Sequence, residues 1–171
     1  MEGGDNAEIS TTAADAYVRP KVRRYLDSLG VQLHDLGFRC PVFLVTSSGG
    51  VTSIEDAMDR PIQLVESGPS GGAALAELTA LRHGEDKVLS FDMGGTTAKI
   101  CLIENGRART SREFEAARNA RFTRGSGLPL RIPVTEMIEI GAGGGSIVQR
   151  DDLNRIQVGP RSAGADPGPG L

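Results

Sequence analysis

A glycine-rich loop in the middle of the chain, Asp92-Met93-Gly94-Gly95-Thr96-Thr97, separates two short apolar runs at 88–91 and 98–103. Runs of this length and composition, bounded by glycine, are typical of buried strands. Asn105-Gly106 follows, and this dipeptide favours a type I′ hairpin turn, so that 107–114 is expected to return as a third strand. The sequence therefore predicts a strand, a tight glycine loop, a strand, a hairpin and a strand.

The residues before this loop predict alternating helices and short strands. Apolar residues from Val18 to Leu36 recur at the spacing of one helical face, with Pro20 near the start of the helix. Ser53 and Asp56 resemble a capping box. The expected elements are a helix from about residue 18, strands at 41–46 and 62–65, a short helix at 54–60 that Pro61 ends, and a helix from the glycine turn at 67–72 to about 82.

The residues after the loop are richer in turns. Segment 118–133 is basic, and it is expected to be either a solvated loop or a surface that faces a partner. A strand at 135–140 leads into a second glycine turn at 141–146, and 147–158 reads as a hairpin interrupted at 151–154. The last residues, 159–170, have no pattern that would form a core.

Composition excludes several classes of protein. The chain has 171 residues, 19 of them Lys or Arg and 22 Asp or Glu, and its net charge of −3 does not favour nucleic acid or an anionic membrane. It has no apolar stretch of about 18 residues, and its first residues lack the features of a secretion signal. A cytoplasmic protein is the expectation. Cys40 and Cys101 lack the spacing of metal ligands, so both are expected to be buried free thiols.

The central loop has the groups that a nucleotide phosphate needs. Gly94 and Gly95 offer backbone N–H groups without a Cβ in the way. Thr96 and Thr97 offer hydroxyl donors at the same turn. The carboxylate of Asp92 could hold Mg²⁺ or orient an attacking water. The alternative is a plain hairpin turn in which the aspartate accepts turn hydrogen bonds.

The order of the elements adds to this interpretation. A helix of small residues followed by a strand, an Asp-x-Gly-Gly-Thr loop and a second strand resembles the order in actin-like ATPases, sugar kinases and heat-shock chaperones. The resemblance implies a partial actin-like ATPase (ribonuclease H-like) α/β fold with a mixed sheet and β-hairpins. Residues 1–66 would then be the end of a preceding lobe, and 67–171 the start of a second lobe.

Five strings in order resemble a narrower family, the hydantoinase A / 5-oxoprolinase family, over nearly the whole chain. They are Val65-Glu66-Ser67-Gly68-Pro69-Ser70-Gly71-Gly72, Phe91-Asp92-Met93-Gly94-Gly95-Thr96-Thr97-Ala98-Lys99, Arg124-Gly125-Ser126-Gly127-Leu128-Pro129, Glu139-Ile140-Gly141-Ala142-Gly143-Gly144-Gly145-Ser146-Ile147 and Val158 to Pro169. This sequence departs from the family at Lys99, where many relatives have Asp, and Lys99 is given no role.

The resemblance implies an ATP-dependent hydrolase of cyclic amides, such as a hydantoin or 5-oxoproline, with Mg²⁺ and a hydantoinase B-type partner subunit. It assigns Asp92 as the catalytic and metal-binding residue and Gly94, Gly95, Thr96 and Thr97 as the second phosphate-binding loop. It also places Gly143, Gly144, Gly145 and Ser146 near the nucleotide, with a purely structural turn as the alternative. The phosphorylated oxygen of the substrate would become a good leaving group.

Three other functions stay open at this point. The carboxylase branch of the same family would act on a ketone. A non-catalytic module would bind nucleotide or dock a subunit. A Rossmann dinucleotide site is the weakest alternative, because 141–146 lacks the last glycine of G-x-G-x-x-G and no clear helix follows it.

The sequence contains one Asp-x-Gly-Gly-Thr loop, whereas actin-like ATPases hold nucleotide between two. The chain is therefore interpreted as an internal fragment. With one side of the cleft absent, phosphate would stay solvated, and most of the electrostatic stabilisation of a dry site would be lost. We expect the isolated chain to hydrolyse ATP negligibly in a phosphate-release assay. Turnover on the order of 1 s⁻¹ or faster would contradict this expectation.

Overall fold

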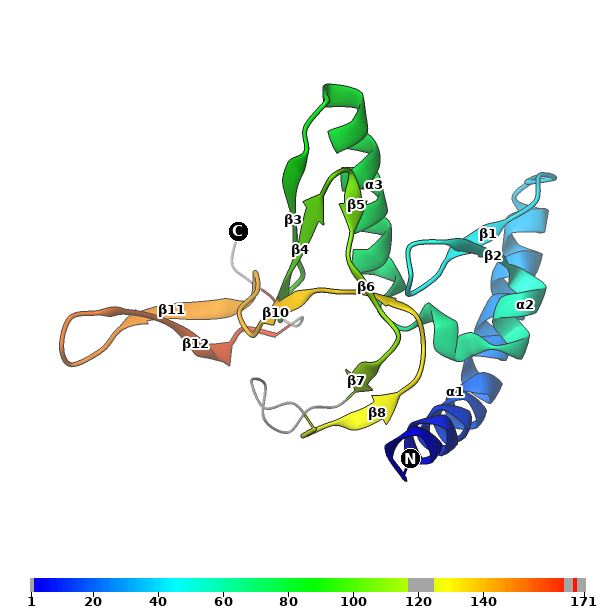
Figure 1. The fold of residues 1–171 in the computed structure, drawn as a ribbon, viewed down its shortest axis with the longest axis horizontal. Coiled ribbons are helices and arrows are strands. Elements are labelled where there is room, and N and C mark those ends of the chain that lie inside the picture. The colour runs from blue at the N-terminus through cyan, green and yellow to red at the C-terminus, as the bar shows by residue number, and fades with distance from the viewer. Residues whose placement is uncertain (1, 117–124, 165–167, 169–171) are drawn as a thin grey trace. The chain divides into compact units, whose positions relative to one another are not determined.

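The computed structural model describes residues 2–116, 125–164 and 168. Its contacts divide the chain into two compact units. The first unit comprises Met1–Ala74 and Arg109–Thr135, and the second comprises Leu75–Ala108 and Glu136–Leu171. Both contain helix and antiparallel strands, so the expected α/β class is confirmed (Figure 1). The division into lobes at residues 66 and 67 stays a prediction.

The described residues of the first unit form helices and three small two-stranded sheets. Strands β1 and β2, β6 and β9, and β7 and β8 pair antiparallel. Its elements in chain order are α1 (Glu2–Asp35), β1 (Phe43–Val45), β2 (Val51–Ser53), α2 (Ile54–Asp59), the 3₁₀ helix η1 (Pro61–Leu64), the start of α3 (Ser67–His83), β6 (Thr110–Ser111), β7 (Phe114–Ala116), β8 (Leu128–Leu130) and β9 (Val134–Thr135).

Helix α1 is longer than the sequence predicted, since it begins at Glu2 and has Pro20 in its interior. A proline inside a helix removes one backbone donor. Arg24 is one turn further on, and its Nε donates to the Pro20 carbonyl at 3.1 Å. The early turns also have a distant partner, because the Arg131 N–H donates to Thr11 Oγ1 at 2.7 Å and its guanidinium pairs with Glu8 at 2.5 Å. The prediction that the helix starts near residue 18 was wrong, because the contacts with Arg131 cannot be inferred from the local sequence.

Helix α2 confirms the expected cap, since Ser53 Oγ accepts a hydrogen bond from the Asp56 N–H at 3.1 Å. The strand expected at 62–65 is wrong, because Pro61–Leu64 forms η1. Proline at the first helical position fixes a helical φ and needs no donor. The next N–H, of Ile62, donates at 3.0 Å to Asp15 Oδ1 on α1. A remote carboxylate therefore stabilises the start of η1.

The core of the first unit forms where α1 and η1 meet β8 and the residues after it. Ile62, Leu130, Ile132 and Val134 are all buried there, and Ala14, Val65, Phe114 and Ala116 pack around them. Leu130 is 2 % exposed. The basic segment 118–133 was predicted as a loop or a partner surface. Its residues 118–124 lie outside the described residues, and its later residues Leu130 and Ile132 belong to this core.

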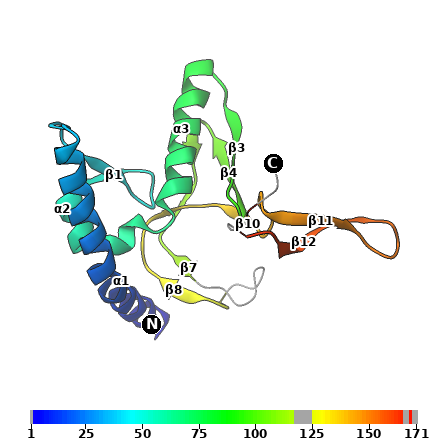
Figure 2. The same ribbon diagram turned by 180° about the vertical axis from the view of Figure 1, so that it is seen from behind.

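The second unit contains a sheet in which β10 (Ile138–Ile140), β4 (Ala98–Glu104) and β3 (Lys87–Met93) lie in that order. Strand β5 (Arg107–Ala108) pairs with the end of β4. A separate hairpin of β11 (Ser146–Arg150) and β12 (Ile156–Ser162) extends from this sheet, and Figure 2 shows it from behind.

Two strand predictions in this region were too long. The returning strand at 107–114 pairs with β4 only over β5, because β10 occupies the rest of that edge of β4. The strand expected at 135–140 is divided into β9 and β10. The type I′ turn agrees with the positive φ angles of Asn105 (55°) and Gly106 (71°).

The two cysteines differ in burial. Cys101 on β4 is buried as expected, and burial, with the Glu77 and Glu136 carboxylates nearby, raises the pKa of its thiol. Cys40 is exposed, so the expectation of a buried thiol was wrong there; it lies in the connection between α1 and β1, directly before Pro41. None of the described helices is both long and apolar enough to span a bilayer.

Candidate functional site

The predicted phosphate loop forms the turn between β3 and β4. Asp92 is the second-last residue of β3, opposite Lys99 of β4, and Met93 lies opposite Ala98. The Gly94 N–H donates to the Thr97 carbonyl at 2.9 Å and closes the turn. The aspartate is thus held by strand pairing, and the turn begins two residues after it.

Several polar groups of the turn stay available. Asp92, Gly95 and Thr96 are exposed. Within the described part of the chain, the N–H groups of Gly95 and Thr96 and the carboxylate of Asp92 make no hydrogen bond. The carboxylate and the two donors lie within five consecutive residues, which is the arrangement that the sequence predicted for a phosphate with a metal ion.

The second predicted glycine segment lies directly against this turn. The Gly144 N–H donates to the Gly94 carbonyl at 2.9 Å, and the Gly145 N–H donates to the Gly95 carbonyl at 2.8 Å. Ser146 holds the segment from within, because its Oγ accepts from the Gly143 N–H at 2.9 Å. The structure therefore brings the two glycine segments together. The nucleotide contacts predicted for Gly143 to Ser146 stay a prediction.

The last residue of β12 and the two residues after it fix the second segment. The Gly145 carbonyl accepts from the Ala163 N–H at 2.7 Å and from Ser162 Oγ at 3.1 Å. The Gly164 N–H donates to Ser162 Oγ at 3.1 Å. Sequence reasoning missed this role, because residues 159–170 have no apolar periodicity and the contacts of Ser162 to Gly164 involve backbone groups and a single hydroxyl.

Three charged residues form a row across the sheet next to the turn. Lys99 of β4 lies opposite Asp92 of β3 on one side and opposite Glu139 of β10 on the other. Residues that face each other in this way have their side chains on the same side of the sheet. Burial lowers the pKa of Lys99, and the Glu139 carboxylate opposes that shift. Lys99, for which no role was predicted, thus lies between the carboxylates of Asp92 and Glu139.

Magnesium fits this site only as part of a complex with phosphate. The described residues contain no cluster of three His, Cys, Asp or Glu side chains that could hold a metal. Mg²⁺ commonly binds through one or two carboxylates together with phosphate oxygens and water. Asp92 supplies one such carboxylate, beside the N–H groups that would contact the phosphate.

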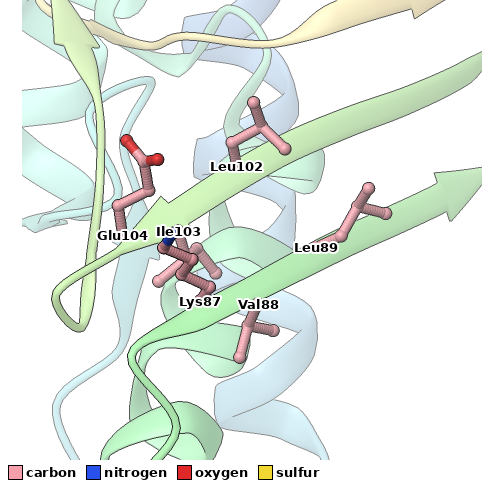
Figure 3. Close-up of a pocket in the computed structure, with 6 residues that line it drawn as sticks. All are labelled: Lys87, Val88, Leu89, Leu102, Ile103 and Glu104. Carbon is pink, nitrogen blue, oxygen red and sulfur yellow. The ribbon is translucent and has the colours of Figure 1, made fainter.

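The structure also has pockets away from the turn. One of about 220 Å³ lies where β3 begins and β4 ends, and Lys87, Val88, Leu89, Leu102, Ile103 and Glu104 line it (Figure 3). The turn is at the opposite end of this hairpin. The tip of the loop is exposed, and none of its residues lines this pocket.

A known family profile matches the chain over residues 8–171, and its description is hydantoinase/oxoprolinase. The chain belongs to the hydantoinase/oxoprolinase family. The match covers every site residue predicted above. It confirms the family that the five strings indicated.

The curated relatives are much longer proteins. An uncharacterized protein of Methanocaldococcus jannaschii is 41 % identical over 163 residues, which are 94 % of this chain and 24 % of that protein. The caprolactamase subunit alpha of Pseudomonas jessenii is 34 % identical over 160 residues, 94 % of this chain and 22 % of that subunit. The chain thus spans about a quarter of the length of these two relatives.

Solved structures agree with the fold. The ATP-dependent caprolactamase of Pseudomonas jessenii superposes with a TM-score of 0.65 at 33 % identity, covering 94 % of this chain and 22 % of that one. The nucleotide-free acetone carboxylase superposes with a TM-score of 0.64 at 26 % identity, covering 83 % and 19 %. The chain has the α/β fold of part of these ATP-dependent enzymes, which is consistent with a partial actin-like fold.

Proposed function

We propose that this chain supplies the second phosphate-binding loop of an ATP-dependent enzyme that opens cyclic amides. The observation that carries the proposal is the turn after β3, where Asp92, Gly95 and Thr96 are exposed and the N–H groups of Gly95 and Thr96 make no hydrogen bond to the described residues. Backbone donors grouped in this way bind anions. The similarity to an ATP-dependent caprolactamase, named for a cyclic amide, supports both the nucleotide and the substrate class.

In this proposal each residue of the turn has a separate role. The Gly95 and Thr96 N–H groups and the Thr96 and Thr97 hydroxyls donate to phosphate oxygens. Asp92 holds Mg²⁺ or orients the attacking group. Magnesium, when bound, would neutralise charge on the phosphates. Transfer of the terminal phosphoryl group to the amide oxygen would break its bond to ADP and activate the carbonyl carbon for attack by water. The C–N bond would then break, with a proton going to the nitrogen, and hydrolysis of the resulting acyl phosphate would release phosphate and the carboxylate.

The turn alone does not surround a nucleotide, so the rest of the site would come from other parts of a longer protein. A companion subunit of hydantoinase B type is part of the proposal, because the caprolactamase relative is itself named as a subunit. A cytoplasmic location is proposed from composition alone.

A ketone carboxylase is the second candidate function. The superposition on acetone carboxylase favours it, at a TM-score close to that for caprolactamase. The two candidates share the phosphate loop and differ in the acceptor of the phosphoryl group. Assays of a longer chain that includes this segment with 5-oxoproline, a hydantoin and acetone would separate them.

Replacing Asp92 with alanine tests the loop. We expect the Asp92→Ala chain to bind Mg·ATP at least about ten-fold more weakly than the wild type in calorimetry, a loss of about 1.4 kcal/mol. The physical reason is the loss of the carboxylate that would hold the metal ion beside the phosphate. Asp152→Ala is the matched control, since Asp152 is an exposed aspartate of the same unit in the turn after β11.

Unchanged affinity in Asp92→Ala would remove Asp92 from the proposed site. Equal losses in Asp92→Ala and Asp152→Ala would show an effect that is not specific to the loop, because a general effect of net charge would instead strengthen the binding of anionic Mg·ATP in both variants. Repeating the titration at higher salt separates the two explanations further, because interactions between exposed, distant charges are screened.

A further inference from the structure

The glycine segment 143–145 packs on the back of the phosphate loop, and this contact controls where the loop's donors point. Gly144 and Gly145 donate to the carbonyls of two successive residues, Gly94 and Gly95, at 2.9 and 2.8 Å. Both carbonyls therefore point toward the segment 143–145. Two neighbouring carbonyls on one side are unlike a regular strand, in which successive carbonyls alternate.

The direction of the donors follows from peptide geometry. A peptide bond is planar and trans, so the C=O of one residue and the N–H of the next point in opposite directions. The N–H of Gly95 must then point away from Gly144, and the N–H of Thr96 away from Gly145. Both donors face the same side of the loop, opposite the glycine segment. Two adjacent N–H groups that converge in this way form a concavity for an anion.

The closeness of the contact requires glycine at one position in particular. A Cβ on Gly143 would lie 2.6 Å from the Gly94 oxygen and 2.7 Å from both the Gly95 carbonyl carbon and the Thr96 nitrogen. These are backbone atoms of the phosphate loop, and they can move away only by moving the loop. Gly144 is different, since a Cβ there would lie 3.8 Å from the Gly94 oxygen, an ordinary contact.

We infer that Gly143, Gly144 and Gly145 are positioning residues that hold the Gly94–Thr96 backbone with its donors turned toward the phosphate. This inference rests on the proposed function and assigns the segment a role other than direct contact with the nucleotide. Gly143 has no side chain and so allows the segment to lie close to the backbone of the loop. The N–H groups of Gly144 and Gly145 hold the carbonyls of Gly94 and Gly95. Ser146 holds the Gly143 end through its Oγ.

The test compares Gly143→Ala with Gly144→Ala by NMR on the ¹⁵N-labelled chain. Without ligand, we expect Gly143→Ala to raise the hydrogen-exchange rate of the residue 144 and 145 amides by about ten-fold or more, because their bonds to the loop are lost. Exchange in the paired part of β3 and β4 should not change. Gly144→Ala should leave the residue 145 amide protected as in the wild type.

The same samples are then titrated with Mg·ATP while the Gly95 and Thr96 amide signals are followed. In the wild type these two signals should shift. In Gly143→Ala the affinity should fall by about ten-fold or more, since each lost hydrogen bond to a charged group accounts for roughly that factor. In Gly144→Ala it should stay close to that of the wild type.

The outcomes separate the inference from the proposed function. If the wild type binds and Gly143→Ala binds equally well, the positioning role is wrong and the proposed loop stands. If Mg·ATP shifts neither the Gly95 nor the Thr96 signal in the wild type, the proposed function fails and the inference falls with it. If Gly143→Ala does not fold, Ser146→Ala replaces it, because it removes the acceptor of the Gly143 N–H without adding a Cβ. The inference then requires that Ser146→Ala show the same loss of amide protection and of Mg·ATP affinity.

Discussion

Replacing Leu130 with alanine is expected to lower the free energy of unfolding of the first unit by about 3 kcal/mol. Leu130 is 2 % exposed and belongs to the core with Ile62, Ile132 and Val134. Removing three of its carbons leaves a cavity, because neighbours held by α1 and η1 can close it only in part. A loss of this size is a large part of the total stability of an ordinary domain.

Leu128→Ala is the matched control for this change. Leu128 is on the same strand, two residues before Leu130, and is 46 % exposed. Its replacement should cost less than about 1 kcal/mol, since half of the side chain is already in water. Urea unfolding followed by circular dichroism at 222 nm measures both, because the chain has no tryptophan and α1 dominates the helix signal of this unit. Equal losses would mean that the core lies elsewhere.

Asp15→Ala is the second change with a large expected effect, a loss of about 2–3 kcal/mol. Asp15 is 7 % exposed on α1. One carboxylate oxygen accepts from the Ile62 N–H at 3.0 Å, and the other pairs with Arg19. Without this carboxylate the Ile62 N–H, itself buried, has no acceptor, and a buried donor that lacks a partner costs its full desolvation energy.

Two further variants define the cause of that loss. Asp27→Ala removes an exposed aspartate from the same helix and should change stability by less than about 0.5 kcal/mol. Asp15→Asn keeps an oxygen for the Ile62 N–H while it removes the negative charge, so it should lose less than Asp15→Ala. If Asp15→Asn and Asp15→Ala unfold at the same urea concentration, the charge pair with Arg19 carries the effect instead of the hydrogen bond.

Of the candidate site, only the turn between β3 and β4 could be predicted from the sequence. Asp92 and the following glycines and threonines could be found because their chemistry lies in consecutive residues. The packing of Gly143 against Gly95 could not be found, since it depends on backbone atoms nearly fifty residues away. The role of Lys99 could not be predicted either, because its neighbours across the sheet, Asp92 and Glu139, are set by the strand register.

The sequence by itself determined the elements whose causes lie within a few residues: the Ser53 cap of α2, the β3–turn–β4 unit, the Asn105-Gly106 turn and the hairpin of β11 and β12. Hydrogen bonds and backbone preferences between near neighbours suffice for these. Tertiary structure alone decided that Pro61–Leu64 is a 3₁₀ helix, that α1 begins at Glu2, and that the two glycine segments meet. Each of these depends on a contact with residues far along the chain. Without that contact, an apolar or glycine-rich run is compatible with several local structures.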